Sequence, residues 1–154
     1  MTPTEVVGAW EYRKQYIGQL EILYAVAPFF TVPEVFAGRE VLHFIDNTAA
    51  VFGIAKGYSS KPDSAKIIHA FHALNSRVAA NIEFRWVASE ANIADLPSRG
   101  DFALLSQWGA ARHQLVVPSV DVWHSADDAM RQASMRPEKA GRPRDARGGR
   151  RGSK

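Results

Sequence analysis

The chain has 154 residues, of which 46% are hydrophobic and 23% are charged, and it contains no cysteine. This length and composition suit one globular domain with its own buried core, and they exclude disulfides and thiolate metal sites. No apolar run is long enough to cross a membrane, and the first residues lack the features of a signal peptide. We therefore expect an intracellular protein, nuclear or cytoplasmic, without a membrane partner.

The net charge of +3 is distributed unevenly along the chain. Residues 136–154 contain eight of the 19 basic and two of the 16 acidic residues, so they carry +6 while residues 1–135 carry −3. This stretch is rich in Arg, Gly and Pro and nearly without apolar side chains, which predicts a disordered tail. Two interpretations stay open: a non-specific contact with nucleic-acid phosphates, or a solvated end without a selected role.

The predicted elements alternate between strand and helix. In chain order we expect a strand over 5–12, a helix over 16–30, a strand over 41–45, helices over 48–56 and 63–79, a strand over 82–87, a helical turn over 92–96, a helix over 101–110 and an extended segment over 115–117. Alternation of this kind predicts an α/β fold in which helices flank a sheet. Ligand sites in such sheets lie at the carboxyl ends of the strands.

Three of these elements have patterns that predict how they are buried. In the first long helix, apolar residues at helical spacing predict one buried stripe that consists of Ile17, Leu20, Tyr24 and Ala27. The strand over 41–45 is apolar without alternation, which favours a central strand covered on both faces. The strand over 82–87 alternates between apolar and polar residues, which is typical of a sheet with one wet face.

Three carboxylates occupy positions that suit metal-dependent phosphodiester chemistry. Glu21 lies in the first long helix, Asp46 directly follows the strand over 41–45, and Asp95 lies in the turn after the strand over 82–87. If these groups converge, their oxygens can hold divalent cations against a phosphodiester. Taken singly, each has an ordinary alternative: Glu21 as a surface acid, Asp46 as a helix N-cap, and Asp95 in an ion pair with Arg99 at i+4.

The three carboxylates stand within motifs that occur in a definite order. The motifs are Leu20-Glu21-Ile22-Leu23-Tyr24-Ala25, then Ile45-Asp46-Asn47-Thr48-Ala49-Ala50 with Lys56-Gly57, then Trp86-Val87-Ala88-Ser89 with Asn92-Ile93-Ala94-Asp95 and Pro97-Ser98-Arg99. Each motif alone is weak, but their order on the expected elements is more specific. Over about residues 8–110 the chain resembles the ribonuclease H domain of retroelement reverse transcriptases, most closely the DIRS-like (tyrosine-recombinase) branch.

The resemblance implies a fold, an activity and a set of site residues. The fold is a ribonuclease H-like mixed sheet flanked by helices, here over residues 1–135, and the activity of the intact parent is endonucleolytic hydrolysis of RNA in RNA–DNA hybrids. The implied catalytic and metal-binding residues are Glu21, Asp46 and Asp95, with Mg²⁺ or Mn²⁺ as cofactor. The residues expected to contact nucleic acid are Asn47, Lys56, Lys61, Ser98 and Arg99.

The chain departs from the family pattern at its N-terminal side. The family has three strands and a first-strand Asp before the position of Glu21, whereas one strand is expected here and its acids are Glu5 and Glu11. We therefore expect an N-terminally incomplete domain with impaired cleavage and an exposed sheet edge that favours self-association. Two other functions stay open: a non-catalytic nucleic-acid-binding or scaffold module, and a DNA nuclease or integrase-type member of the superfamily.

Overall fold

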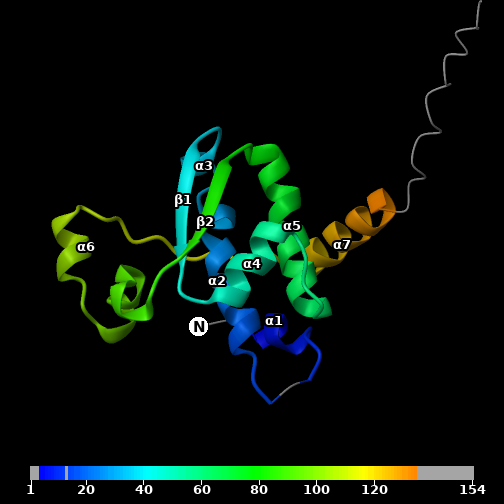
Figure 1. The fold of residues 1–154 in the computed structure, drawn as a ribbon, viewed down its shortest axis with the longest axis horizontal. Helices are drawn as coiled ribbons and strands as arrows, with labels where there is room; N and C mark the ends of the chain where they lie inside the picture. Colours follow the sequence, from blue (N-terminus) through cyan, green and yellow to red (C-terminus); the bar gives the residue numbers. More distant parts are fainter. Residues whose placement is uncertain (1–3, 13, 135–154) are drawn as a thin grey trace, which may run out of the picture.

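A computed structural model describes residues 4–12 and 14–134 as a set of helices around a small sheet (Figure 1). The helices are α1 (Thr4–Gly8), α2 (Ile17–Thr31), α3 (Pro33–Phe36), α4 (Thr48–Lys56), α5 (Pro62–Val78), α6 (Ala103–Gln107) and α7 (Val120–Ser134). The strands are β1 (Glu40–Ile45) and β2 (Asn81–Trp86), and single 3-10 turns span Ser89–Ala91, Ile93–Asp95 and Pro97–Arg99. The predicted α/β class is confirmed in this coarse form. The tail predicted over 136–154 lies outside the described residues.

The sheet consists of β1 and β2, which pair in parallel with Glu40 opposite Asn81 and Ile45 opposite Trp86. Within the described residues each strand therefore has one edge without a strand partner. The larger mixed sheet implied by the resemblance is not formed in this part of the chain. Unpaired edges of this kind favour strand addition from another chain, so the expectation of self-association stays a prediction.

The segment over 5–12 is a helix followed by a turn, and the prediction of a strand there is wrong. Val6 and Trp10 are both buried, at 5% and 7% exposed, because their four-residue spacing places them on the same side of the chain. The indole of Trp10 stacks on that of Trp123 in α7, with 6.5 Å between ring centroids. Contact with a distant helix therefore overrides the local preference of this segment for strand.

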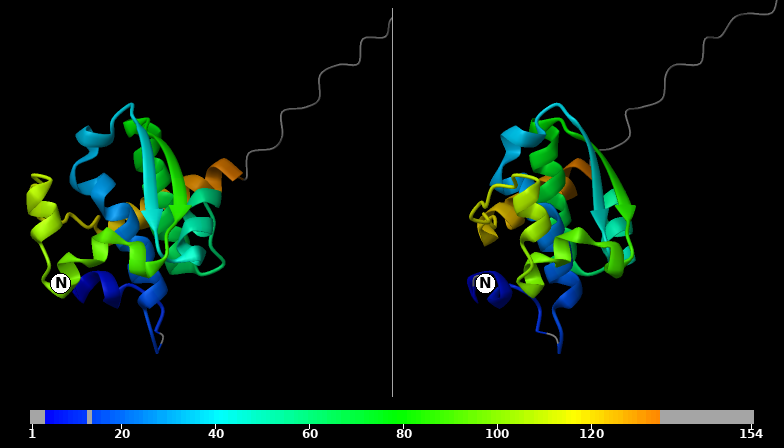
Figure 2. Two further views of the ribbon diagram at one scale, coloured as in Figure 1. Left: turned by 60° about the vertical axis from the view of Figure 1, so that its left-hand side comes forward. Right: turned by 90° about the vertical axis from the view of Figure 1, so that its left-hand side faces the viewer.

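The core lies between α2, α5 and α7, with the inner face of the sheet closing it on one side (Figure 2). Its most completely buried large side chains include Leu23 and Phe29 from α2, Ile67 and Phe71 from α5, and Trp123 from α7. The Phe29 ring contacts the Phe71 ring edge-on at 5.2 Å, a geometry that aromatic pairs prefer. The helix α7 completes this core, although the sequence pattern gave no prediction for it.

The burial predicted for α2 and β1 needs correction. In α2, Ile17 and Tyr24 are 58% and 42% exposed, whereas Leu23 and Val26 are fully buried. This helix is apolar nearly all round, so residue spacing did not identify the face that packs on α5. β1 alternates between half-buried and exposed residues, and Leu42 and Phe44 are 55% and 53% exposed on the outer face. The sheet is therefore covered on one face and open on the other in the described structure.

Several local predictions are confirmed. α4 ends at Gly57, which adopts φ 68° and terminates the helix in the left-handed conformation that glycine tolerates. α5 spans Pro62–Val78 as its apolar spacing predicts, and β2 spans Asn81–Trp86 with one wet face. The helix predicted over 101–110 is shorter than expected, at Ala103–Gln107. The extended segment packs back on the body, where the Val116 amide donates a hydrogen bond to Thr31 Oγ1 at 3.0 Å.

Candidate functional site

Asn47 connects the carboxyl end of β1 to two helices. Its side-chain Oδ1 accepts a hydrogen bond from the Ala50 amide at 2.9 Å, which caps the N-terminus of α4. Its Nδ2 donates a hydrogen bond to a carboxylate oxygen of Glu21 in α2. These two bonds hold Glu21 beside the residue that follows Asp46, so two of the three predicted carboxylates come to the same end of the sheet.

Asp46 is held in place through its backbone. Its carbonyl oxygen accepts a hydrogen bond from Trp86 Nε1 at 3.1 Å, which joins the ends of the two strands. The alternative interpretation of Asp46 as an N-cap is wrong, because Asn47 occupies the capping position of α4. The Asp46 carboxylate forms no hydrogen bond or ion pair with any other described residue.

Asp95 takes part in local interactions within its own turn. One carboxylate oxygen lies 4.0 Å from Arg99 Nη2, and the other accepts a hydrogen bond from Asn92 Nδ2 at 3.5 Å. The Ser98 hydroxyl donates a hydrogen bond to the Asp95 carbonyl at 2.6 Å. The ordinary alternative, an ion pair with Arg99 at i+4, is thus present. Arg99 is largely exposed, so this pair contributes little to stability.

The three carboxylates do not form a shared metal centre in the described structure. Across residues 4–12 and 14–134, no three His, Cys, Asp or Glu side chains are placed to hold one ion. One oxygen of Glu21 is also occupied by Asn47. Mg²⁺ requires near-octahedral oxygen ligation, and the arrangement present does not supply a protein ligand set for a pair of ions.

A small hollow of about 210 Å³ lies beside Asn47, between the first turn of α2 and the start of α5. Two of the residues predicted to contact nucleic acid, Asn47 and Lys61, line it. The polar side chains that join them are Gln19, Ser59, Ser60 and Ser64. Gln19 is 3% exposed, and its Nε2 has no hydrogen-bond partner among the described residues. Gln19 therefore lines the hollow as a buried side chain whose amide nitrogen has no described acceptor.

The sequence did not identify the other polar residues of this hollow, namely Gln19, Ser59, Ser60 and Ser64. Gln19 is a single polar residue inside an apolar helix, and only the packing of α2 shows that it is buried. Ser59-Ser60-Lys61 directly precedes Pro62, the first residue of α5, and this is the signal that a sequence reader could have used. Hydroxyl and ammonium donors at the start of a long helix are typical of anion sites.

The other predicted nucleic-acid contacts lie outside this hollow. The Lys56 ammonium lies over the Phe52 ring, 5.6 Å from its centroid, at the end of α4. Ser98 and Arg99 lie in the turn after Asp95, where both interact with that residue. The predicted contacts therefore lie in three places: Asn47 and Lys61 at the starts of α4 and α5, Lys56 at the end of α4, and Ser98 with Arg99 beside Asp95.

Comparison of the chain with protein-family models, curated proteins and solved structures finds no match. None of the described helices combines the length and the apolar character that crossing a membrane requires. The function is therefore inferred from the geometry of the site.

Proposed function

We propose that the chain is a nucleic-acid-binding module of ribonuclease H-like descent, derived from a reverse transcriptase, which takes an RNA–DNA hybrid as its ligand. The order of the elements supports this proposal: Asp46 follows β1, Asn47 caps α4, and β2 pairs in parallel with β1. Glu21 reaches the same strand end from α2. This is the order in which the motifs of the related domains occur.

The observation that carries the proposal is the hollow beside Asn47. Its polar lining is rich in donors, namely the ammonium of Lys61, the hydroxyls of Ser59, Ser60 and Ser64, and the amide of Gln19. A buried amide without a partner costs roughly 1–3 kcal/mol, and a phosphate oxygen of a nucleic-acid backbone would satisfy it. Charge-assisted hydrogen bonds to an ammonium would strengthen the contact. The volume of about 210 Å³ suits one phosphate rather than a base pair.

The carboxylates next to this hollow give the proposed binding a dependence on divalent cation. Glu21 and Asp46 would repel a phosphate in their vicinity, and a Mg²⁺ or Mn²⁺ ion held by these carboxylates would supply positive charge that offsets the repulsion. Two carboxylates and several waters hold one ion weakly. We therefore propose that hydrolysis of the RNA strand, the activity of the intact parent, is impaired in this chain.

A second candidate function is a non-catalytic nucleic-acid-binding or scaffold module. The observation that favours it is that the described residues contain no three-carboxylate group. In that case the Arg-rich stretch over 136–154 would supply the binding through non-specific phosphate contacts. A DNA nuclease or integrase-type activity would use the same carboxylates as the first proposal, so it differs from that proposal in its substrate.

The test is binding of a fluorescently labelled RNA–DNA hybrid and of the matching DNA duplex, measured by anisotropy with the full chain. Lys61→Ala should weaken hybrid binding about tenfold and lower the salt slope by about 1. Lys66→Ala, in α5 but outside the hollow, is the matched control. Equal binding by wild type and Lys61→Ala would contradict the proposal, and a preference for the DNA duplex would support the DNA nuclease or integrase-type alternative.

The role of the carboxylates is tested with Asp46→Asn in Mg²⁺ and in EDTA. Under the proposal, the substitution lowers hybrid binding in Mg²⁺ and leaves it unchanged or higher in EDTA, because it removes both a metal ligand and a negative charge. The exposed Asp128→Asn is the control. Higher binding by Asp46→Asn in both conditions would contradict a bound cation. Efficient Mg²⁺-dependent cleavage, lost in Asp46→Asn, would contradict the proposed impairment.

A further inference from the structure

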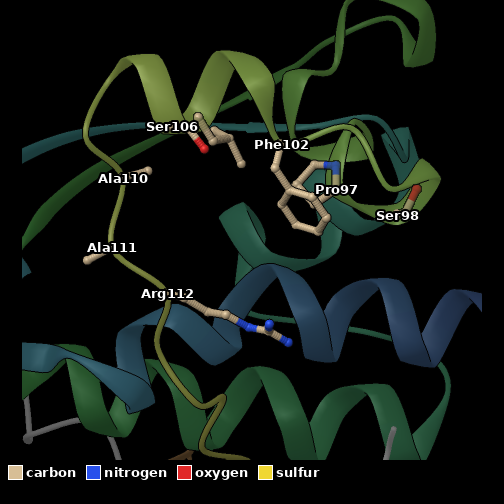
Figure 3. Close-up of a pocket in the computed structure, with 8 residues that line it drawn as sticks. Pro97, Ser98, Phe102, Ser106, Ala110, Ala111 and Arg112 are labelled. Atoms are coloured by element: carbon tan, nitrogen blue, oxygen red, sulfur yellow. The ribbon is translucent and has the colours of Figure 1, made fainter.

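A larger hollow of about 670 Å³ is enclosed by the segment over 97–112, which folds back on itself through α6 (Figure 3). Its walls include the apolar side chains of Pro97, Phe102 and Leu105 and the polar side chains of Ser106 and Arg112. A concave site of this size, mostly apolar with few polar groups, has the character of a small-ligand site. This hollow is separate from the hollow beside Asn47 that is proposed to bind phosphate, because the two hollows share no lining residue.

Phe102 gives this hollow an aromatic wall. Its ring projects inward beside Pro97 in Figure 3, and the residue is 52% exposed. An aromatic ring left open to solvent in a concavity offers a face on which a planar group can stack. Base–aromatic stacking of this kind tolerates every base, since each base has a π-face.

Arg112 gives the hollow a positive charge at its opposite margin. Its side chain crosses below the ring of Phe102 in Figure 3. Its guanidinium forms no hydrogen bond or ion pair with any other described residue. Arginine remains charged at all accessible pH values, and its planar fork matches two oxygens of a phosphate. The hollow thus pairs a stacking surface with an uncommitted anion-binding group.

The position of this hollow relates it to the turn that carries Asp95. Pro97 and Ser98 line the hollow, and Ser98 is hydrogen-bonded to the Asp95 carbonyl. A strand of nucleic acid that passes Asp95 and Arg99 would therefore bring a neighbouring nucleotide to the mouth of the hollow. We propose that the hollow binds one unpaired nucleotide, with its base on Phe102 and its phosphate on Arg112. The choice of a nucleotide over another planar acid rests on the proposed function.

The test uses 2-aminopurine riboside 5′-monophosphate titrated with the full chain, read by fluorescence quenching and anisotropy. Saturable binding is expected. Phe102→Leu and Arg112→Gln should each weaken it by at least ~5-fold, the lower end of the measured contribution of one stacked base. The exposed Phe52→Leu and Arg77→Gln are the matched controls and should bind as wild type does. A wild-type chain that does not bind the probe, or two pocket variants that bind it unchanged, would overturn the inference.

The unphosphorylated riboside separates the two contacts. Arg112→Gln should bind it as wild type does, because the phosphate that contacts Arg112 is absent, whereas Phe102→Leu should still bind it more weakly. In a Lys61→Ala background, in which the hollow beside Asn47 lacks its ammonium, Phe102→Leu and Arg112→Gln should still weaken nucleotide binding. An equal loss of riboside binding in Arg112→Gln would contradict the assigned phosphate contact.

Failure of this inference is distinguishable from failure of the proposed function. If hybrid binding depends on Lys61 but nucleotide binding does not depend on Phe102, the nucleotide pocket is rejected and the proposed function stands. If nucleotide binding depends on Phe102 and Arg112 but the chain does not bind the hybrid, the pocket stands as a nucleotide site and the proposed function is rejected.

Discussion

The helical body and the segment over 89–112 are held together in different ways. In the body, α2, α5 and α7 bury large side chains such as Phe71 and Trp123 almost completely. In the segment over 89–112 no residue is buried, and its structure is maintained by turns such as the one around Asp95. Stability therefore resides in the body, while the proposed nucleotide pocket lies in the part that is least constrained. Ligand-binding segments commonly have this character.

The sheet is intermediate between these two regions in its burial. Its inner face contacts the core through Ile45 and His43, and its outer face exposes Leu42 and Phe44. The residues proposed to bind phosphate lie together with the carboxylate of Glu21 where β1 ends and α4 begins, at the edge of the body. This difference means that substitutions in the site can change ligand binding without unfolding the chain.

The largest expected effect is on the free energy of unfolding, when one phenylalanine in each region is replaced. Phe71→Ala should lower the free energy of unfolding by about 3–5 kcal/mol, because it opens a cavity in a packed core. Phe102→Ala should change it by no more than ~0.5 kcal/mol, because the ring is half exposed. Urea unfolding followed by circular dichroism measures both values. Similar losses in the two variants would show that the segment over 89–112 is part of the cooperative core.

A smaller effect is expected where α7 joins the body. His69 Nδ1 and Asp127 Oδ1 lie 2.9 Å apart, and Asp127 is 5% exposed. Asp127→Ala should cost about 1–3 kcal/mol, since it removes a partner from a polar group in the interface between α5 and α7. Asp128→Ala, at the adjacent exposed position, should be close to neutral. An equal cost for both substitutions in the same urea assay would mean that the pair does not anchor α7.

The smallest effect is a dependence of stability on pH. Burial lowers the pKa of His43, and a hydrogen bond with the backbone of Ala25 opposes this shift only in part. The unfolded chain therefore binds the proton more readily, so stability is complete above the ordinary histidine pKa and falls as the pH drops toward the folded value.

Urea midpoints measured between about pH 7 and pH 5, the range in which histidine titrates, should show this loss. His43→Phe keeps a ring beside Phe29 and Phe84 and should reduce the pH dependence. An unchanged pH dependence in His43→Phe would assign it to another titratable group.

Features that depend on local interactions were predicted correctly from the sequence. Features that depend on contacts between distant parts of the chain were missed. α4 and α5 were predicted because their apolar spacing and the glycine at position 57 act locally. The helix at Thr4–Gly8 was missed because its burial depends on Trp123, more than a hundred residues away. The open outer face of β1 was missed for a similar reason, since an apolar strand does not indicate how many layers cover it.

In the candidate site, too, the features set by local sequence were predicted and those set by packing were missed. The position of Asp46 at the end of β1 was predicted from the strand pattern, and the contact of Glu21 with Asn47 follows only from the packing of α2 beside α4. Asp95 was expected to join them, but the described residues form no three-carboxylate group. Arg112 was not singled out, because only the fold of the segment over 97–112 brings it opposite Phe102.

The central claim is that the end of β1 is where this chain binds its cation and its nucleic acid. The most direct measurement is the paramagnetic broadening of backbone amide signals in the ¹⁵N-labelled full chain as Mn²⁺ is added in sub-stoichiometric amounts. We predict that the signals of Glu21, Asp46 and Asn47 broaden first and that Asp46→Asn removes this selectivity. Broadening that begins at other acidic residues, such as Asp121 or Asp128, with these three signals unaffected, would contradict the account.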